Sequence, residues 1–141
     1  MKEIIGVYSN LDTEYDVEIV EEFFSHYSFM IETLEPLIIK LEDANYYKNN
    51  INEIFRIFHN IKSSSGYLKI TPINKLVTLG EEVLEECRTV EGSASVELID
   101  WLILLSDQLK IYQSNLEINS DKFSPLNHNI IKVPINYIKN K

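Results

Sequence analysis

The sequence predicts an all-α protein: an antiparallel, up-down four-helix bundle with a short C-terminal extension. Four stretches of the 141-residue chain carry apolar residues at alternating spacings of three and four, the pattern of an amphipathic helix. Gly and Pro occur only four times each, which argues against a turn-rich all-β fold. The connections are short, so we expect one domain over residues 1–141, with the bundle at about 12–116 and a tail at 117–141.

The first helix is expected from about residue 12 to residue 43. Asp12 or Thr13 is the expected N-cap, because both side chains accept hydrogen bonds from the first turn. Pro36 lies inside the pattern and removes one backbone donor, so we expect a kink or a short break at 33–36. The apolar stripe consists of Val20, Phe23, Phe24, Tyr27, Met30, Ile31, Leu34, Leu37, Ile38 and Leu41.

The second helix follows a polar stretch at 45–50, which is either a loop or the first turn of this helix. Asn50 and Glu53 resemble a capping box, with Asn in place of the usual Ser or Thr. Gly66 is the point where this helix is expected to end. Its apolar side carries Ile51, Ile54, Phe55, Phe58, Ile61, Ser65 and Leu68.

The third helix is expected to begin with Thr71 as N-cap and Pro72 at the first helical position. Gly80 lies on its apolar stripe and indicates either a close approach of a neighbouring helix or an irregularity costing about 1 kcal/mol relative to Ala. Cys87 lies on the same stripe and is expected to fill the core. After a turn at 89–94, the fourth helix has the stripe Val96, Ile99, Leu102, Leu105, Leu109, Tyr112 and Leu116.

The tail differs in pattern from the four helices. From Ile131 to Tyr137 apolar and other residues nearly alternate, which predicts a short edge strand, with Pro134 excluding a central position. The run at 4–8 is the only other strand-like segment, and the two are candidates to pair. The alternative is a docking tail that is disordered alone; we favour a packed tail.

The charge and the hydropathy pattern exclude several classes of partner. The chain has 13 Lys and Arg against 22 Asp and Glu, a formal net charge of −9, which disfavours nucleic acids and anionic membrane surfaces. No apolar run approaches the roughly 20 residues of a membrane helix, and the N-terminus lacks a secretion signal. With a single cysteine, these features predict a cytoplasmic protein.

Metal and cofactor sites are not expected. A di-iron bundle needs a Glu three residues before a His, whereas His26, His59 and His128 are preceded there by Phe23, Arg56 and Pro125. The chain has no zinc-type spacing of His or Cys. It also has no Gly-rich phosphate loop, so we expect no ATP site, no metal and no cofactor.

His59 is the candidate for chemistry. Its face of the second helix is basic, small and polar, while the opposite face is apolar, so we expect the imidazole to point into solvent. A neutral imidazole with a pKa near about 6.5 is a good nucleophile at cytoplasmic pH. Lys62, one turn away, would attract a phosphoryl group, and Ser63 and Gly66 are small enough to admit a second protein. The alternative is a solvated histidine without a role.

The segment from Phe55 to Ile73 resembles the phosphoacceptor segment of histidine phosphotransfer (HPt) domains, most closely the N-terminal HPt domain of CheA-type chemotaxis kinases. The family motif is His-x-Ile/Leu-Lys-Gly-Ser/Gly/Ala with a second Gly soon after, and the matching residues are His59, Ile61, Lys62 and Gly66. The helix opened by Thr71-Pro72 also matches in position, and the resemblance covers about residues 12–116. Ser63 stands where the family has Gly.

The resemblance implies a role for each site residue. His59 would accept the phosphoryl group on Nε2, Lys62 would assist it, and Glu81 would accept a hydrogen bond from Nδ1 of His59. Glu82 and Glu85 are the substitutes if the register differs, and Thr78 would also face His59. The docking face for a partner is expected on the first and second helices around His59. Its candidate residues are Phe55, Arg56, Ser63, Gly66 and Tyr67 on the second helix.

The implied function is that of a phosphorelay intermediate rather than an enzyme. The phosphoryl group would arrive from a histidine kinase or a receiver aspartate and leave to a response-regulator receiver, which supplies Mg²⁺. Two alternatives stay open: an HPt-like binding module that is not phosphorylated, for which Ser63 is the one favourable feature, and the phosphoacceptor fragment of a larger CheA-type kinase. The starting methionine and the patterned tail favour a stand-alone protein.

Overall fold

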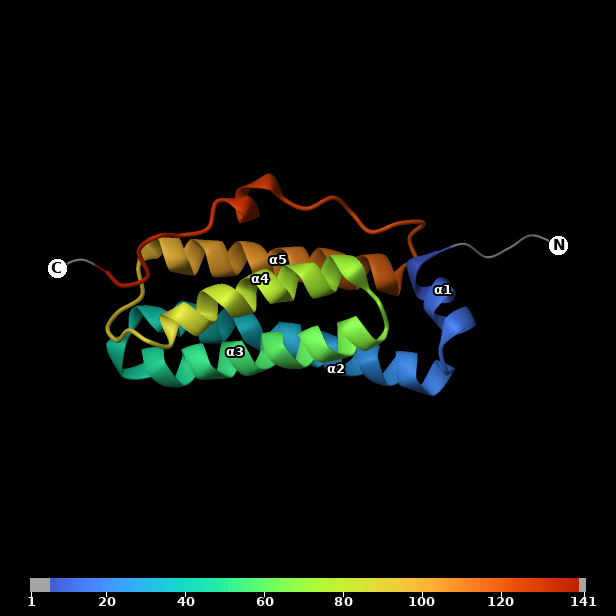
Figure 1. Ribbon diagram of the computed structural model, residues 1–141, viewed down its shortest axis with the longest axis horizontal. Coiled ribbons are helices and arrows are strands. Elements are labelled where there is room, and N and C mark those ends of the chain that lie inside the picture. The colour runs from blue at the N-terminus through green and yellow to red at the C-terminus, as the bar shows by residue number, and fades with distance from the viewer. Residues whose placement is uncertain (1–5, 140–141) are drawn as a thin grey trace.

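The computed structural model describes residues 6–139. This part of the chain is helical and has no β-strand beyond one isolated bridge, which confirms the predicted all-α class. Four long helices lie side by side along the molecule, and a short helix lies at one end of them (Figure 1). The helices are α1 (Val7–Glu14), α2 (Val17–Ile39), α3 (Ala44–Tyr67), α4 (Thr71–Cys87) and α5 (Val96–Glu117), with short 3-10 helices η1 (Lys40–Glu42) and η2 (His128–Ile131).

The first long helix starts later than the sequence pattern predicts. Asp12 and Thr13 lie inside the separate helix α1, and Asp16 is the N-cap of α2, accepting a hydrogen bond of 2.9 Å from the backbone N–H of Glu18. The expected break at 33–36 is absent, since α2 runs through Pro36 to Ile39. The carbonyl that Pro36 leaves without its helical donor belongs to Glu32, an exposed residue, so the helix tolerates the loss.

Helix α3 begins earlier than predicted. Asp43 is its N-cap and accepts from the backbone N–H of Asn45 at 2.9 Å, so the polar stretch at 45–50 is helix rather than loop. Asn50 is not a cap: its side chain is buried and donates to the carbonyl of Leu37 at 3.1 Å, tying α3 to α2. The helix ends at Tyr67, next to Gly66, as expected.

Helix α4 begins one residue before the predicted first helical position. Ile70 is the N-cap, and Thr71 and Pro72 are the first two helical residues. Gly80 marks a close helix approach, because a Cβ there would lie 2.6 Å from Cε2 of Phe58 on α3 and 3.1 Å from Leu105 on α5. A side chain at this position would collide with the core, so the irregularity interpretation is wrong.

The predicted stripes form one shared core. Cys87 is fully buried in it, and burial raises the pKa of its thiol to about 12. A thiol of this kind is a poor nucleophile, as expected for core packing. The largest fully buried side chains on α2, η1, α3 and α4 include Tyr27, Ile31, Leu34, Ile38, Leu41, Tyr47, Ile51, Ile54, Phe58, Ile61 and Ile73.

The tail is packed, but the predicted strand pair is wrong. Val7 and Tyr8 belong to helix α1, and the rest of the run at 4–8 lies outside the described residues, except Gly6. The start of α1 instead meets the segment just after α5, as a helix cap: the side-chain oxygen of Asn119 accepts from the backbone N–H groups of Tyr8 and Ser9, each at 3.0 Å.

The tail runs back along α5, as Figure 1 shows, and bonds to its side chains. The indole of Trp101 donates to the carbonyl of Ile130 at 2.9 Å, and Gln108 donates to the carbonyl of Pro125 at 3.2 Å. Ser95 donates from its hydroxyl to the carbonyl of Asn136 at 2.6 Å. Near its end the tail also pairs with the backbone just before α5: the N–H of Ser95 donates to the carbonyl of Tyr137 at 2.8 Å, and the N–H of Lys139 donates to the carbonyl of Ser93 at 2.7 Å. The tail backbone is thus bonded to side chains and to a loop rather than to a partner strand.

None of the helices within residues 6–139 is both long enough and apolar enough to cross a membrane.

Candidate functional site

His59 lies in the middle of α3 on its solvent side. Ile54, Phe58 and Ile61 on the same helix are fully buried, whereas the His59 side chain is 56% exposed. The difference follows from helical periodicity, because His59 is one residue past the buried stripe. The imidazole is therefore open to an incoming group.

Glu81 on α4 faces His59 across the two helices. Its Oε1 lies 3.4 Å from Nδ1 of the imidazole, and its side chain is 15% exposed. When Nδ1 carries the proton and donates to this carboxylate, Nε2 has its lone pair free. Counting without gaps from the His59 segment through Thr71 predicts this neighbour, and the structure has the same register.

Lys62 shares the same carboxylate oxygen. Its Nζ lies 3.6 Å from Oε1 of Glu81, and its side chain is 42% exposed. An ion pair this exposed contributes at most about 1 kcal/mol to stability. The arrangement therefore positions a cation beside the imidazole more than it stabilises the fold.

The second oxygen of the Glu81 carboxylate is not satisfied. Oε2 is buried and has no hydrogen-bond partner within the described part of the chain. Burying an unpartnered carboxylate oxygen costs free energy, so stability alone does not account for a glutamate here. Such costs concentrate at functional sites.

Phe55 and Arg88 complete the surroundings of His59. The Phe55 ring lies one turn before the imidazole, with centroids 6.1 Å apart and planes inclined by 10°. The guanidinium of Arg88 lies 4.4 Å from the centroid of the Phe55 ring. The sequence analysis did not predict a role for Arg88. The antiparallel register that pairs His59 with Glu81 also places 52 and 55 near 85 and 88, so this register could have identified Arg88 as a neighbour of Phe55.

Three other acidic or hydroxyl candidates do not contact His59. Thr78 donates its hydroxyl to the carbonyl of Asn74 at 2.7 Å, within its own helix. Glu82, the residue after Glu81, is exposed, and Glu85 pairs with Arg88 at 3.2 Å. The substitutes for Glu81 are therefore not needed.

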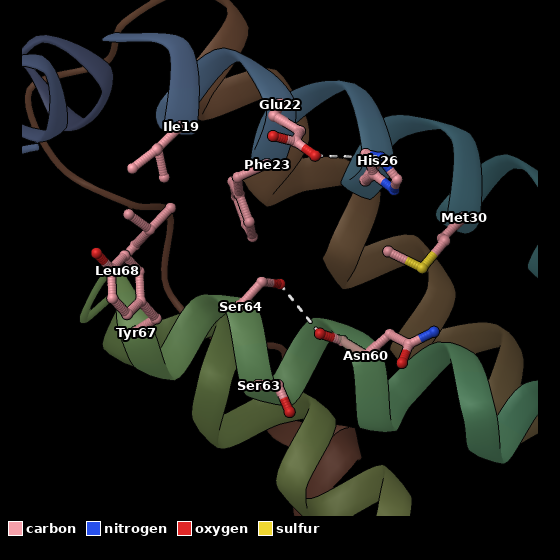
Figure 2. Close-up of a pocket in the computed structure, with 10 residues that line it drawn as sticks. All are labelled: Ile19, Glu22, Phe23, His26, Met30, Asn60, Ser63, Ser64, Tyr67 and Leu68. Atoms are coloured by element: carbon pink, nitrogen blue, oxygen red, sulfur yellow. Dashed lines mark hydrogen bonds and ion pairs between the residues drawn. The ribbon is translucent and has the colours of Figure 1, made fainter. Parts of the chain in front are cut away.

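A groove of about 450 Å³ lies between α2 and α3, beside the helix face that carries His59. Figure 2 shows side chains from both helices around it, with Phe23 and Met30 from α2 reaching toward α3. Two residues predicted to dock a partner, Ser63 and Tyr67, line it, and Tyr67 is 63% exposed. His26, also on α2, lies at its edge within 4.0 Å of Glu22.

The other predicted docking residues differ in accessibility. Arg56 is exposed and bonds to Glu53 at 3.1 Å, whereas Phe55 is half-buried. Gly66 is exposed, but a Cβ there would lie 3.3 Å from the amide nitrogen of Asn74. That amide donates to the carbonyl of Lys62 at 2.9 Å, so Gly66 also leaves room for a contact between α3 and α4.

No cluster of three or more His, Cys, Asp or Glu side chains within residues 6–139 is placed to hold a metal ion.

Comparison with known proteins gives one family and several relatives. The family model described as "Hpt domain" matches residues 18–115. The chain is 30% identical over 100 residues to the chemotaxis protein CheA of Borreliella burgdorferi, covering 71% of this chain and 12% of that relative. It is 30% identical to the sensor histidine kinase CheAY of Helicobacter pylori and 24% identical to the chemotaxis protein CheA of Treponema pallidum, each over 66% of this chain and 12% of the relative. The chain thus matches about an eighth of the length of these curated relatives. No solved structure matches it significantly.

Proposed function

The chain belongs to the Hpt domain family, and from that premise we propose that it is a phosphotransfer protein in which His59 carries the phosphoryl group. Family membership supports phosphotransfer in two-component signalling by a module without its own catalytic site. One observation carries the assignment to His59: its exposed imidazole has Nδ1 held toward the Glu81 carboxylate, which leaves Nε2 available.

The proposed step is a reversible nucleophilic substitution at phosphorus. The lone pair of Nε2 attacks the phosphorus of an aspartyl phosphate on a receiver, or the γ-phosphorus of ATP bound to a kinase. An N–P bond forms as the P–O bond breaks, and the carboxylate, or ADP, leaves with the electron pair. The imidazole becomes cationic, with its proton on Nδ1 facing Glu81, whose negative charge stabilises that cation. Transfer to the next aspartate is the reverse reaction.

Lys62 has a separate role in this step. Its ammonium group lies one turn from the imidazole and forms a partly exposed ion pair of 3.6 Å with Glu81. An ammonium has three donors on a flexible stem, so Lys62 can contact an equatorial phosphoryl oxygen while it stays near the carboxylate. It would offset the charge brought to an already acidic protein of formal charge −9.

The partners follow from this chemistry. We propose a histidine kinase or a phosphorylated receiver as donor and a response-regulator receiver as acceptor, all in the cytoplasm. The Mg²⁺ that receiver chemistry requires would come with the receiver, so the chain would use no cofactor of its own. The groove between α2 and α3 would receive part of the partner surface, next to Ser63.

The test is phosphorylation by a cognate kinase or a phosphorylated receiver. The wild type is expected to acquire an acid-labile, base-stable phosphoryl label, and His59→Gln to abolish it, because glutamine has no nucleophilic nitrogen. His128→Gln is the matched control, since His128 is also exposed and lies on η2, outside the groove. Label that persists in His59→Gln contradicts the assignment.

A second candidate function is a binding module that docks a receiver without taking phosphate. The observation in its favour is Ser63, which stands where the family motif has Gly and is exposed at the groove. Its signature would be a wild-type protein that binds the receiver yet stays unlabelled, with the same affinity in His59→Gln.

A further inference from the structure

We infer that Phe55 and Arg88 form a positioning stack that fixes the orientation of the His59 imidazole for phosphoryl transfer. This inference rests on the proposed function, in that it assigns new residues to the same site. Phe55 was expected only as a docking residue, and Arg88 had no predicted role.

The contact between Phe55 and His59 is a parallel stack. The two residues are four apart on α3, a spacing that brings side chains together on one helix face. Their ring planes differ by 10° and their centroids are 6.1 Å apart. Because Phe55 is half-buried while His59 is largely exposed, the phenyl ring is the fixed member of the pair.

Arg88 holds the phenyl ring from the neighbouring helix end. Its guanidinium carbon lies 4.4 Å from the centroid of the Phe55 ring, a cation–π distance. Two side chains hold the Arg88 guanidinium. Its Nε donates to the side-chain oxygen of Asn52 on α3 at 3.1 Å, and its Nη1 donates to the carboxylate of Glu85 on α4 at 3.2 Å. The planar guanidinium is thereby oriented by partners on two elements.

The imidazole needs such support because its other restraint is weak. The contact of Nδ1 with Glu81 is 3.4 Å long, and the ring is more than half exposed. Two side-chain torsions of His59 are free unless a neighbour limits them. Transfer requires Nε2 to approach phosphorus in line with the P–O bond that breaks. A displacement of Nε2 by about 1 Å can lower the rate by a large factor. A flat ring parallel to the imidazole restricts rotation of the imidazole about these torsions.

The inference separates orientation from docking, and two measurements keep them apart. The first is the rate at which His59 is phosphorylated by phosphoramidate, a small donor that transfers its phosphoryl group to Nε2 and releases ammonia. No protein surface takes part in that reaction. The second is the NMR order parameter of the His59 ring, which reports how freely the ring moves and is obtained from the relaxation of its carbon–hydrogen pairs. A purely structural residue would change neither without lowering the melting temperature.

Four variants test the stack. Phe55→Leu keeps an apolar side chain without a ring and is expected to lower the phosphoramidate rate about tenfold and to loosen the His59 ring. Phe55→Tyr restores the aromatic face and is expected to restore both values. Arg88→Gln is expected to lower the rate about threefold, and Arg88→Lys, which keeps the charge but not the plane, to lie between Arg88→Gln and wild type.

Matched controls come from outside the site. Phe29→Leu removes an exposed phenyl ring from α2, and Lys48→Gln removes an exposed cation from α3 that pairs with Glu91 at 3.6 Å. Both are expected to match wild type.

Three results would overturn the inference: a Phe55→Leu rate equal to wild type, no rescue by Phe55→Tyr, or a loss confined to transfer from a receiver, which would make Phe55 a docking residue. Failure of the proposed function looks different. Wild-type His59 would then take no label from phosphoramidate or from a receiver, while the ring order of Phe55→Leu would still report whether the stack holds the imidazole.

Discussion

At the scale of single residues, the carboxylate of Glu81 connects the two groups that the proposed reaction uses. One oxygen contacts both Nδ1 of His59 and Nζ of Lys62, and the other is buried without a partner among the described residues. The carboxylate therefore sets the tautomer of the imidazole and the position of the ammonium group together. Its net contribution to stability is small, since one pairing is exposed and one oxygen is unsatisfied.

Substitution of Glu81 tests this connection. Glu81→Gln keeps the size of the side chain and a hydrogen-bond acceptor but removes the charge, so we expect phosphorylation of His59 to slow about 10- to 100-fold. Single-turnover transfer from a phosphorylated receiver measures it. Glu82→Gln removes a charge from the next, exposed position and is expected to leave the rate near wild type. Equal rates in the two variants would remove Glu81 from the site.

The same scale shows what the sequence can and cannot predict of the site. Helical periodicity places His59 on the solvent side, and a count along the chain from His59 to Glu81 gives the facing residue without coordinates. Arg88 was not predicted, because its contact depends on a long side chain reaching across to Phe55. Periodicity gives the direction of a side chain but not its reach.

At the scale of helices, caps and glycines decide where elements begin and how closely they pack. The amphipathic stripes predicted the existence of all four long helices, but the starts of α2 and α3 were displaced by competing acidic residues. Asp16 and Asp43 accept from the first turns of α2 and α3, whereas the predicted caps lie inside helices. Several Asp, Asn and Thr residues precede each stripe, and only the backbone geometry selects one of them.

Gly80 gives a prediction at this scale. Gly80→Ala would place a methyl group 2.6 Å from the fully buried Phe58 ring, so strain outweighs the helix propensity that alanine gains. We expect a loss of about 1–2 kcal/mol in the free energy of unfolding, measured by urea denaturation.

A second variant shows whether Phe58 is the cause. The double variant Gly80→Ala with Phe58→Leu is expected to lose less than the sum of the two single losses, because the smaller side chain makes room. Strictly additive losses, or a more stable Gly80→Ala protein, would contradict the close approach of α3 and α4.

At the scale of the whole molecule, the tail is part of the fold. Its carbonyls accept from the indole of Trp101 and the amide of Gln108 on α5, and its own Ile130 is fully buried. The alternating pattern predicted a strand with one inward face, but its apolar members Ile131, Val133 and Ile135 are exposed. Here the tail backbone bonds to side chains of α5 and to the backbone at 93–95, contacts that a sequence pattern does not encode.

Two neighbouring isoleucines test the role of the tail. Ile130→Ala is expected to cost about 2–5 kcal/mol in unfolding free energy and to shift the emission of Trp101, the only tryptophan, to longer wavelength. Ile131→Ala is the control, since Ile131 is 66% exposed and should change neither quantity. Equal stability and emission in both variants would mean that the tail does not cover α5 in solution.

The central claim is that one nitrogen of one histidine carries the phosphoryl group, and long-range proton–nitrogen NMR spectra of the phosphorylated protein test it most directly. We expect a single phosphohistidine, with the N–P bond at Nε2 of His59 and the proton on Nδ1. Phosphate on His26, on His128 or on Nδ1 of His59 would contradict the claim, as would a protein whose three imidazoles stay unmodified.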